Sequence, residues 1–193
     1  PGVAIATVIA QLERCGATVV GIPCNTAHAP SIFEVIKENV VRRGSAVTLV
    51  DMVSETVAFL RVHHAGIERV GVLGTTGAQR ARVYPRVLES NGLQAVVPTD
   101  DDQERIIHPA IVDKRYGIKA CSLPVSQRAR NDLISSVRTL ASAGAEAVVL
   151  GCTEIPLAIT EKHIDGVVIV DPTLILARAL IRAIAPEKLL PLH

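Results

Sequence analysis

The segment GATVVGIPCNT (residues 16–26) joins a glycine, a short aliphatic run and a cysteine that polar residues follow at once. Shifting the sequence by 128 residues places it on GAEAVVLGCTE (144–154), with glycine on glycine and cysteine on cysteine. The apolar positions of the helical patterns in front of the two segments also coincide. The chain therefore contains the same unit twice: helix, glycine, apolar strand, cysteine.

Helical and strand patterns alternate along the whole chain. Short aliphatic runs predict strands, and apolar residues at helical spacing predict helices. This alternation predicts an α/β fold with mainly parallel sheets flanked by helices, and the repeat predicts two similar domains related by pseudo-twofold symmetry. The expected helices are 3–14, 30–39, 53–64, 79–90, 103–112, 127–142 and 173–184, and the expected strands are 17–23, 47–51, 69–76, 93–98, 145–151 and 166–171.

The amino-acid composition argues against several classes of protein. Of the 193 residues 49% are hydrophobic and 2% aromatic, and the net charge is +1. Few aromatic rings and almost no net charge argue against a nucleic-acid partner. The absence of an apolar run of about 18 residues and of a basic signal segment argues against a membrane span or export, so we expect a cytoplasmic protein. In that reducing compartment its four cysteines should be thiols.

Two of the four cysteines are candidates for chemistry. Cys24 and Cys152 each follow a predicted strand at its carboxyl end, where open α/β sheets bind ligands, and packing alone does not explain a cysteine there twice. Facing each other across a cleft, they could remove a proton from one face of a carbon and return it to the other. We interpret Cys15 and Cys121 as small buried hydrophobes. No metal is expected, because zinc needs more ligands than these cysteines and the nearby His28 supply.

The chain resembles the aspartate/glutamate racemase family, whose members need no pyridoxal phosphate. Four motifs carry the resemblance: PCNTAH, GVLGTTGA, IKA and GCTE. It runs from near residue 6 to about residue 180, and it implies two similar α/β domains, an active site between them and no cofactor. It also implies that Cys24 and Cys152 are the paired acid and base.

The resemblance further implies roles for residues around the cysteines. Asn25, Thr26 and Thr153 would bind the substrate α-carboxylate. Lys119 matches a lysine of aspartate racemases that lies near the cysteines and can neutralise a carboxylate. Glu154 stands where glutamate racemases typically carry histidine, which favours an aspartate-specific or broad-specificity enzyme.

The residues themselves leave three further assignments open. Thr75 and Thr76 either cap a helix or present their hydroxyls at the rim of the cleft. His28 either orients a thiol or a side-chain carboxylate, or is a structural donor at the start of a helix.

The resemblance also predicts the domain organisation. In the family a strand and a glycine-rich turn precede the helix with which this sequence begins, so we expect a first domain that is short at its N-terminus. We predict a first domain of residues 1–51 plus 164–193 and a second of 52–163. Because such a small first domain exposes a strand edge, we expect a homodimer.

The favoured function is an amino-acid racemase that interconverts L- and D-aspartate, with glutamate as a further candidate substrate. A maleate-type cis-trans isomerase of the same superfamily is the first alternative, in which one cysteine adds to the substrate as a nucleophile. An inactive module that binds dicarboxylates is the second alternative. Each of the three has a small amino acid or dicarboxylate as its ligand.

Overall fold

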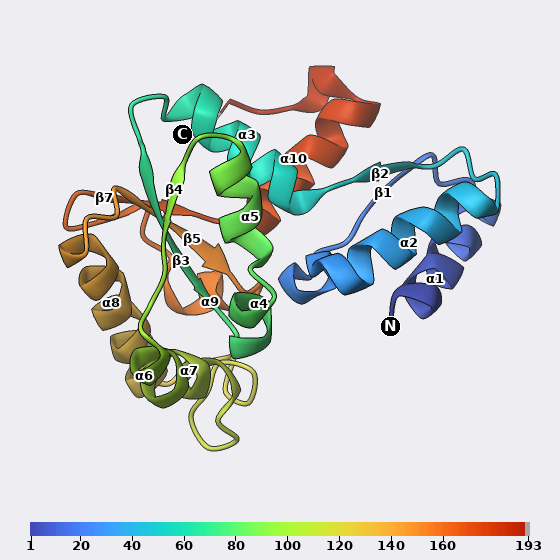
Figure 1. The fold of residues 1–193 in the computed structure, drawn as a ribbon. Helices are drawn as coiled ribbons and strands as arrows, with labels where there is room; N and C mark the ends of the chain where they lie inside the picture. Colours follow the sequence, from blue (N-terminus) through green and yellow to red (C-terminus); the bar gives the residue numbers. More distant parts are fainter. Residues whose placement is uncertain (192–193) are drawn as a thin grey trace.

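The computed structural model describes residues 1–191, which form a smaller and a larger lobe (Figure 1). In the smaller lobe β1 pairs in parallel with β2, and an aliphatic core that includes Ile9, Val20 and Ile36 lies between this pair and two helices. The elements of this lobe are α1 (Gly2–Arg14), β1 (Val19–Gly21), the 3₁₀ turn η1 (Asn25–His28), α2 (Pro30–Arg42) and β2 (Thr48–Val50).

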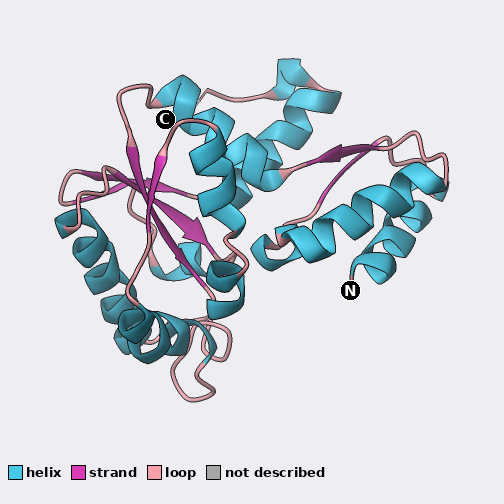
Figure 2. Ribbon diagram, in the orientation of Figure 1, coloured by secondary structure: helices cyan, strands magenta, loops and turns pink. Residues whose placement is uncertain are grey.

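The larger lobe is built on a five-stranded sheet in the order β4-β3-β5-β7-β6 (Figure 2). All neighbouring strands run parallel except β6, which is antiparallel to β7. The central strand β5 is buried along its whole length, as expected for a parallel strand covered on both faces. The strands are β3 (Arg69–Gly74), β4 (Gln94–Val96), β5 (Ala147–Gly151), β6 (His163–Ile164) and β7 (Val167–Val170).

Helices cover both faces of this sheet. Alternate residues of β5 point to opposite faces: Val148 and Leu150 join a core with α7, α8 and α9, whereas Ala147 and Val149 join a core with α3, α5 and α10. The helical elements are α3 (Met52–His63), α4 (Thr76–Arg80), α5 (Val83–Ser90), α6 (Asp100–Asp102), the π-helical η2 (Gln103–Ile107), α7 (His108–Val112), α8 (Gln127–Ser142), α9 (Ile155–Ala158), α10 (Pro172–Ile184) and η3 (Pro186–Lys188).

The repeated helix–glycine–strand unit is confirmed at the level of backbone hydrogen bonds. Gly16 follows α1 with φ +95°, and Gly144 follows α8 with φ +91°. In both units the residue after the glycine donates its N–H to the carbonyl five residues earlier, at 3.0 Å and 2.9 Å. This is a left-handed helix cap that glycine adopts at little steric cost. The α/β class with mainly parallel sheets is likewise confirmed.

Two predicted helices differ from those observed. Instead of one helix over 79–90 there are α4 and α5, separated at Arg82, whose φ is +49°. The break places Pro85 in the first turn of α5, where its missing N–H costs nothing. The helix expected over 103–112 begins earlier, at Asp100, where Thr99 caps α6, and continues through the π-helical segment.

One strand joins a different sheet from the one expected. Residues 166–171 were predicted to return to the first domain, but β7 pairs with β5 in the larger sheet. The helix that follows it, α10, does return and packs against β1 and β2. Gly21 allows this close approach, because a Cβ there would lie 2.7 Å from Leu176. Among residues 1–191 no helix is both long and apolar enough to cross a membrane.

Candidate active site

Cys24 lies just beyond β1 in the smaller lobe. The cysteine is exposed, its backbone is extended (φ −152°, ψ 108°), and η1 starts at the next residue. Its carbonyl accepts hydrogen bonds from the Ala27 N–H at 3.1 Å and from Nδ1 of His28 at 2.9 Å. The turn after the strand therefore fixes the backbone that carries the thiol.

His28 is a buried positioning group for that backbone. Its Nδ1 bonds to the Cys24 carbonyl and therefore carries the hydrogen, which leaves Nε2 to accept from the Met52 N–H at 3.3 Å. The ring also stacks on Phe33, with centroids 4.6 Å apart. Burial lowers the pKa of His28, and the neutral tautomer satisfies both hydrogen bonds. These contacts support the structural alternative for this histidine.

Asn25 connects the two lobes. Its side chain is 3% exposed, and its Oδ1 accepts a 2.6 Å hydrogen bond from the hydroxyl of Tyr84 on α5. Burial raises the pKa of Tyr84, so this hydroxyl stays a donor. The Nδ2 of Asn25 is buried and has no partner among the described residues. With its oxygen occupied, Asn25 has only its amide hydrogens left for a further hydrogen bond. Tyr84 was not among the site residues predicted from the sequence.

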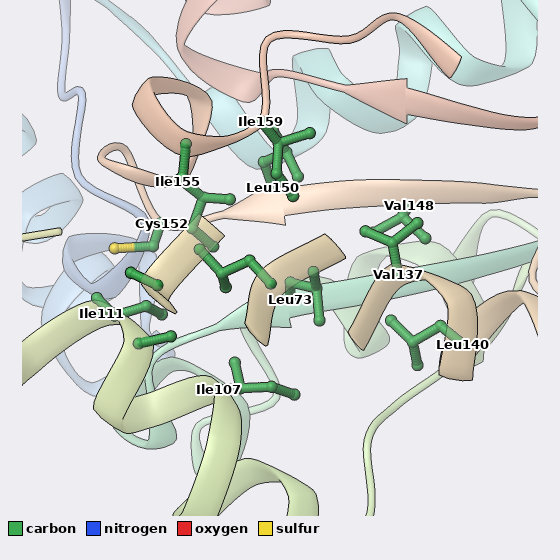
Figure 3. Packing of buried hydrophobic residues seen from close by; sticks show 14 of the residues in the cluster. Leu73, Ile107, Ile111, Val137, Leu140, Val148, Leu150, Cys152, Ile155 and Ile159 are labelled. Atoms are coloured by element: carbon green, nitrogen blue, oxygen red, sulfur yellow. The ribbon is translucent and has the colours of Figure 1, made fainter. Parts of the chain in front are cut away.

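Cys152 follows β5 in the larger lobe and is 6% exposed. Its side chain packs at the edge of an apolar cluster, and its sulfur points away from Leu73 and Leu150 (Figure 3). The sulfur lies 3.0 Å from Oε2 of Glu154. Burial, and then the hydrogen bond to Glu154, raises the pKa of Cys152 to about 12. At neutral pH this residue is a thiol whose hydrogen points at a carboxylate.

The carboxylate of Glu154 accepts hydrogen bonds from three donors. Besides the Cys152 thiol, Oε2 accepts from the Thr153 hydroxyl at 3.1 Å, and Oε1 lies 2.9 Å from Nζ of Lys119. Partial burial favours the neutral acid, but the hydrogen bonds from Cys152 and Lys119 outweigh it and lower the pKa of Glu154. Glu154 is therefore ionised at neutral pH.

Lys119 interacts electrostatically with both cysteines. Its pKa is raised, first by the hydrogen bond to Glu154 and further by electrostatic interactions with Cys152, Glu154 and Cys24. The ammonium group therefore lies within electrostatic range of both sulfurs, although they belong to different lobes. Cys24, Glu154 and Cys152 thus all interact electrostatically with Lys119, and the four residues are here called the group around Lys119.

The repeat is not symmetric at this site. The shift that places Cys24 on Cys152 also places Thr26 on Glu154. Thr26 is exposed in η1 and carries no charge. The carboxylate therefore stands beside only one of the two cysteines.

The two threonines after β3 have contacts within the protein. The Thr75 hydroxyl accepts from the Ala78 N–H at 3.4 Å and so caps α4, the structural alternative considered from the sequence. The Thr76 hydroxyl accepts from Nε2 of Gln103 at 3.4 Å, and its N–H donates to Nδ1 of His108. A role for either threonine in binding substrate stays a prediction.

The described residues offer no cluster of three or more His, Cys, Asp or Glu side chains that could hold a metal ion. The group around Lys119 contains two thiols, one carboxylate and one ammonium group.

A family model, Asp/Glu/Hydantoin racemase, matches residues 1–180. The chain belongs to this family. In sequence it is 26% identical over 170 residues to the broad-specificity amino-acid racemase RacX of Bacillus subtilis, a match that covers 88% of this chain and 66% of RacX. The resemblance seen in the four sequence motifs is thereby confirmed.

Solved racemase structures share the fold. An aspartate racemase homologue from Pyrococcus horikoshii superposes with a TM-score of 0.72 at 26% identity, covering 92% of this chain and 71% of its own. The aspartate racemase of Picrophilus torridus superposes with a TM-score of 0.70 at 25% identity, covering 95% and 69%. The chain thus spans about two thirds of the length of these family members.

Proposed function

We propose that this chain is a racemase that interconverts L- and D-aspartate, and that Cys24 and Cys152 are its two acid/base groups. Its family and its similarity to aspartate racemases support the reaction class. The observation that carries the proposal is the position of Lys119, within electrostatic range of one cysteine from each lobe. Glutamate is the second substrate to test.

The two cysteines have unequal surroundings, and this difference can assign the base and the acid. The α-hydrogen of an amino acid is a very weak acid, so its removal needs a thiolate, and its replacement on the other face needs a thiol. Burial and Glu154 keep Cys152 protonated, whereas Cys24 is exposed. We assign Cys24 as the base and Cys152 as the acid in the resting enzyme.

The proposed step balances protons and charge. The Cys24 thiolate takes the α-hydrogen as a proton, and the C–H electron pair stays on the α-carbon. The carbanion then takes the proton of the Cys152 thiol on its opposite face. Cys24 ends as the thiol and Cys152 as the thiolate, so the product state is ready for the reverse reaction.

Fixed charges and donors would hold the substrate during this step. Asn25 can donate its unpaired amide hydrogens to the substrate carboxylate, and the hydroxyls of Thr26 and Thr153 lie next to the two cysteines in the chain. The Lys119 ammonium offsets negative charge near both sulfurs, and a preorganised cation of this kind stabilises a developing carbanion more than water does. We propose these four residues as the substrate-binding group.

Proton NMR of L-aspartate, then L-glutamate, in deuterated buffer tests the proposal directly. We expect the α-proton signal to disappear and the D-enantiomer to form with the intact chain. Both should be lost in Cys24→Ser and in Cys152→Ser. Cys15→Ser is the matched control, because Cys15 is exposed and lies at the end of α1, outside the group around Lys119.

Three results would contradict the proposal. One is a folded chain that exchanges no α-proton of either amino acid. A second is conversion of maleate to fumarate without amino-acid exchange, which would identify the isomerase. A third is tight binding of aspartate without turnover, which would identify a binding module.

Three further properties inferred from the sequence stay predictions. They are the division into 1–51 plus 164–193 and 52–163, across which β7 pairs with β5, the homodimer and the cytoplasmic location. Light scattering after size-exclusion chromatography would measure the oligomeric state, and limited proteolysis would locate the domain boundaries.

A further inference from the structure

A cavity of about 470 Å³ lies away from the cysteine site, between α3 and α10 and the strands β5 and β7. Its volume is within the range of pockets that bind small molecules. Cys24, Lys119, Cys152 and Glu154 do not line it. The apolar part of its lining, here called the floor, includes Phe59, Leu150, Val168, Val170, Leu174 and Ile175.

The rim of this cavity is rich in groups that are, or can become, positively charged. His63 and His64 come from the end of α3 and its C-terminal cap, His163 from β6 and Arg178 from α10, and Lys162 also lines it. Burial, and then the neighbouring His63 and His163, lowers the pKa of His64. His63 and His163 therefore both lie close enough to His64 to disfavour its protonated form, and the three imidazoles are here called the histidine cluster.

The two acidic residues of the lining are engaged within the protein. Glu161 pairs through both carboxylate oxygens with Arg130. Asp171 caps α10 by accepting from two backbone N–H groups at its start. Arg178, by contrast, donates to a backbone carbonyl, that of Leu190, at 2.9 Å. Both acidic side chains of the lining therefore already have partners within the protein.

We propose that this cavity binds a small amphipathic carboxylate, whose hydrocarbon part lies on the apolar floor and whose carboxylate is held by the histidine cluster. The floor removes hydrocarbon from water, which favours a ligand with an extended apolar body over aspartate. An anion also offsets the repulsion of His64 by His63 and His163, because it stabilises the protonated form of an imidazole. The inference concerns a second site and does not depend on the racemase proposal.

Isothermal titration calorimetry with octanoate on the intact chain, at pH 6 and at pH 8, measures this binding. The charged and titratable groups facing the ligand are the histidine cluster, Lys162, Arg178, Glu161 and Asp171. Only the imidazoles have ordinary pKa values in this range, so their protonation should tighten binding at the lower pH. We expect about fivefold to tenfold, since each partly exposed charge pair contributes roughly a factor of two to five.

Two other probes test the contributions of the apolar body and of the negative charge separately. Octanol, which has the same body without the charge, should bind more weakly and equally at the two pH values. Inorganic phosphate, an anion without the body, should give no detectable heat. L-Aspartate at saturating concentration should not compete with octanoate, because it would occupy the cysteine site.

A matched pair of variants locates the ligand. Leu174 and Ile184 are both on α10 and are 54% and 64% exposed, but only Leu174 lines the cavity. We expect Leu174→Glu to weaken octanoate binding at least tenfold and Ile184→Glu to leave it unchanged. His64→Asn should remove most of the pH dependence.

Several results would overturn the inference: no octanoate heat at either pH, equal losses in Leu174→Glu and Ile184→Glu, or displacement by aspartate. Binding of octanol as tight as that of octanoate would also overturn it, since the histidine cluster would then not hold the carboxylate. Circular dichroism and thermal melts of each variant establish that it is folded.

Discussion

The carboxylate of Glu154 lies 3.0 Å from the sulfur of Cys152 and accepts its hydrogen bond. Both this contact and the burial of the thiol favour the protonated form. Lys119, bound to the other carboxylate oxygen, keeps Glu154 ionised. The charge of Glu154 thus adds to the effect of burial in keeping Cys152, two positions earlier, protonated.

Removing that charge should change Cys152 in a measurable way. In Glu154→Gln we expect the pKa of Cys152 to fall from about 12 toward its ordinary value, because a neutral amide no longer disfavours the thiolate. The thiolate absorbance near 240 nm, followed against pH, reports this change. Racemisation should fall by about tenfold or more, because the Cys152 thiol loses the acceptor that orients it and Lys119 loses its ion-pair partner.

Glu161→Gln is the matched control for this experiment. Glu161 is also a salt-bridged glutamate, but its partner is Arg130 and it does not contact Cys152. An unchanged titration of Cys152 in Glu154→Gln, or an equal change in Glu161→Gln, would contradict the assigned role.

The two cysteines should differ in reactivity toward iodoacetamide at pH 7.5. Cys24 is exposed, whereas Cys152 is buried and protonated. We expect Cys152 to be alkylated at least tenfold more slowly, since the thiolate is the nucleophile. Mass spectrometry of tryptic peptides measures both rates in one sample, and exposed Cys15 supplies the reference. Equal rates would show that the thiols are not distinguished in solution.

Tyr84→Phe should weaken the connection between the lobes. The substitution removes the hydroxyl that donates a hydrogen bond to Oδ1 of Asn25. A buried polar group left without a partner lowers the free energy of unfolding by about 1–3 kcal/mol. Urea denaturation measures this loss of unfolding free energy, and racemisation should fall because Asn25 is no longer oriented. Tyr116→Phe, at the other tyrosine, should change stability by less than about 0.5 kcal/mol. A similar loss in both variants would exclude a specific role for the Asn25 bond.

Stability should fall as the pH drops below 6.5, in part through His28. Burial lowers the pKa of His28 in the folded state, so the unfolded chain binds its proton first. The contribution is complete above the unfolded pKa of about 6.5 and is lost as the pH falls through the folded pKa. Unfolding free energies from pH 7.5 to 5 measure the slope, which His28→Gln should reduce. The same reduction from a substitution of exposed His63 would refute the assignment to His28.

Much of the fold was predictable from the repeat. The turn between a helix and the following strand needs a residue with positive φ, and a glycine at that place in the sequence therefore marks the turn. Gly16 and Gly144 meet that requirement with the same hydrogen bonds. The break at Arg82 was missed because apolar spacing continues through it, although Pro85 would have clashed inside a continuous helix. The pairing of β7 with β5 was missed because a strand's own sequence does not say which sheet it joins.

The candidate site was predictable where it follows strand ends and unpredictable where it depends on packing between distant segments. The sequence placed Cys24 and Cys152 at two equivalent strand ends. It did not identify Tyr84, which lies 59 positions after Asn25 and reaches it only through the packing of α5 against η1. His28 and Thr75 have contacts that follow from their own turns, and both correspond to the structural alternatives.

Thr26 stands in the repeat where Glu154 stands beside the second cysteine, so the two halves of the site are chemically unequal. Two enantiomers have the same free energy in water, and for a racemase this fixes kcat/KM at one value for both directions. The one-sided carboxylate can therefore make L- and D-aspartate turn over at different maximal rates only if their KM values differ in the same ratio. Such an enzyme would convert the two enantiomers at different rates at saturating substrate, and at equal rates when the substrate concentration is far below KM.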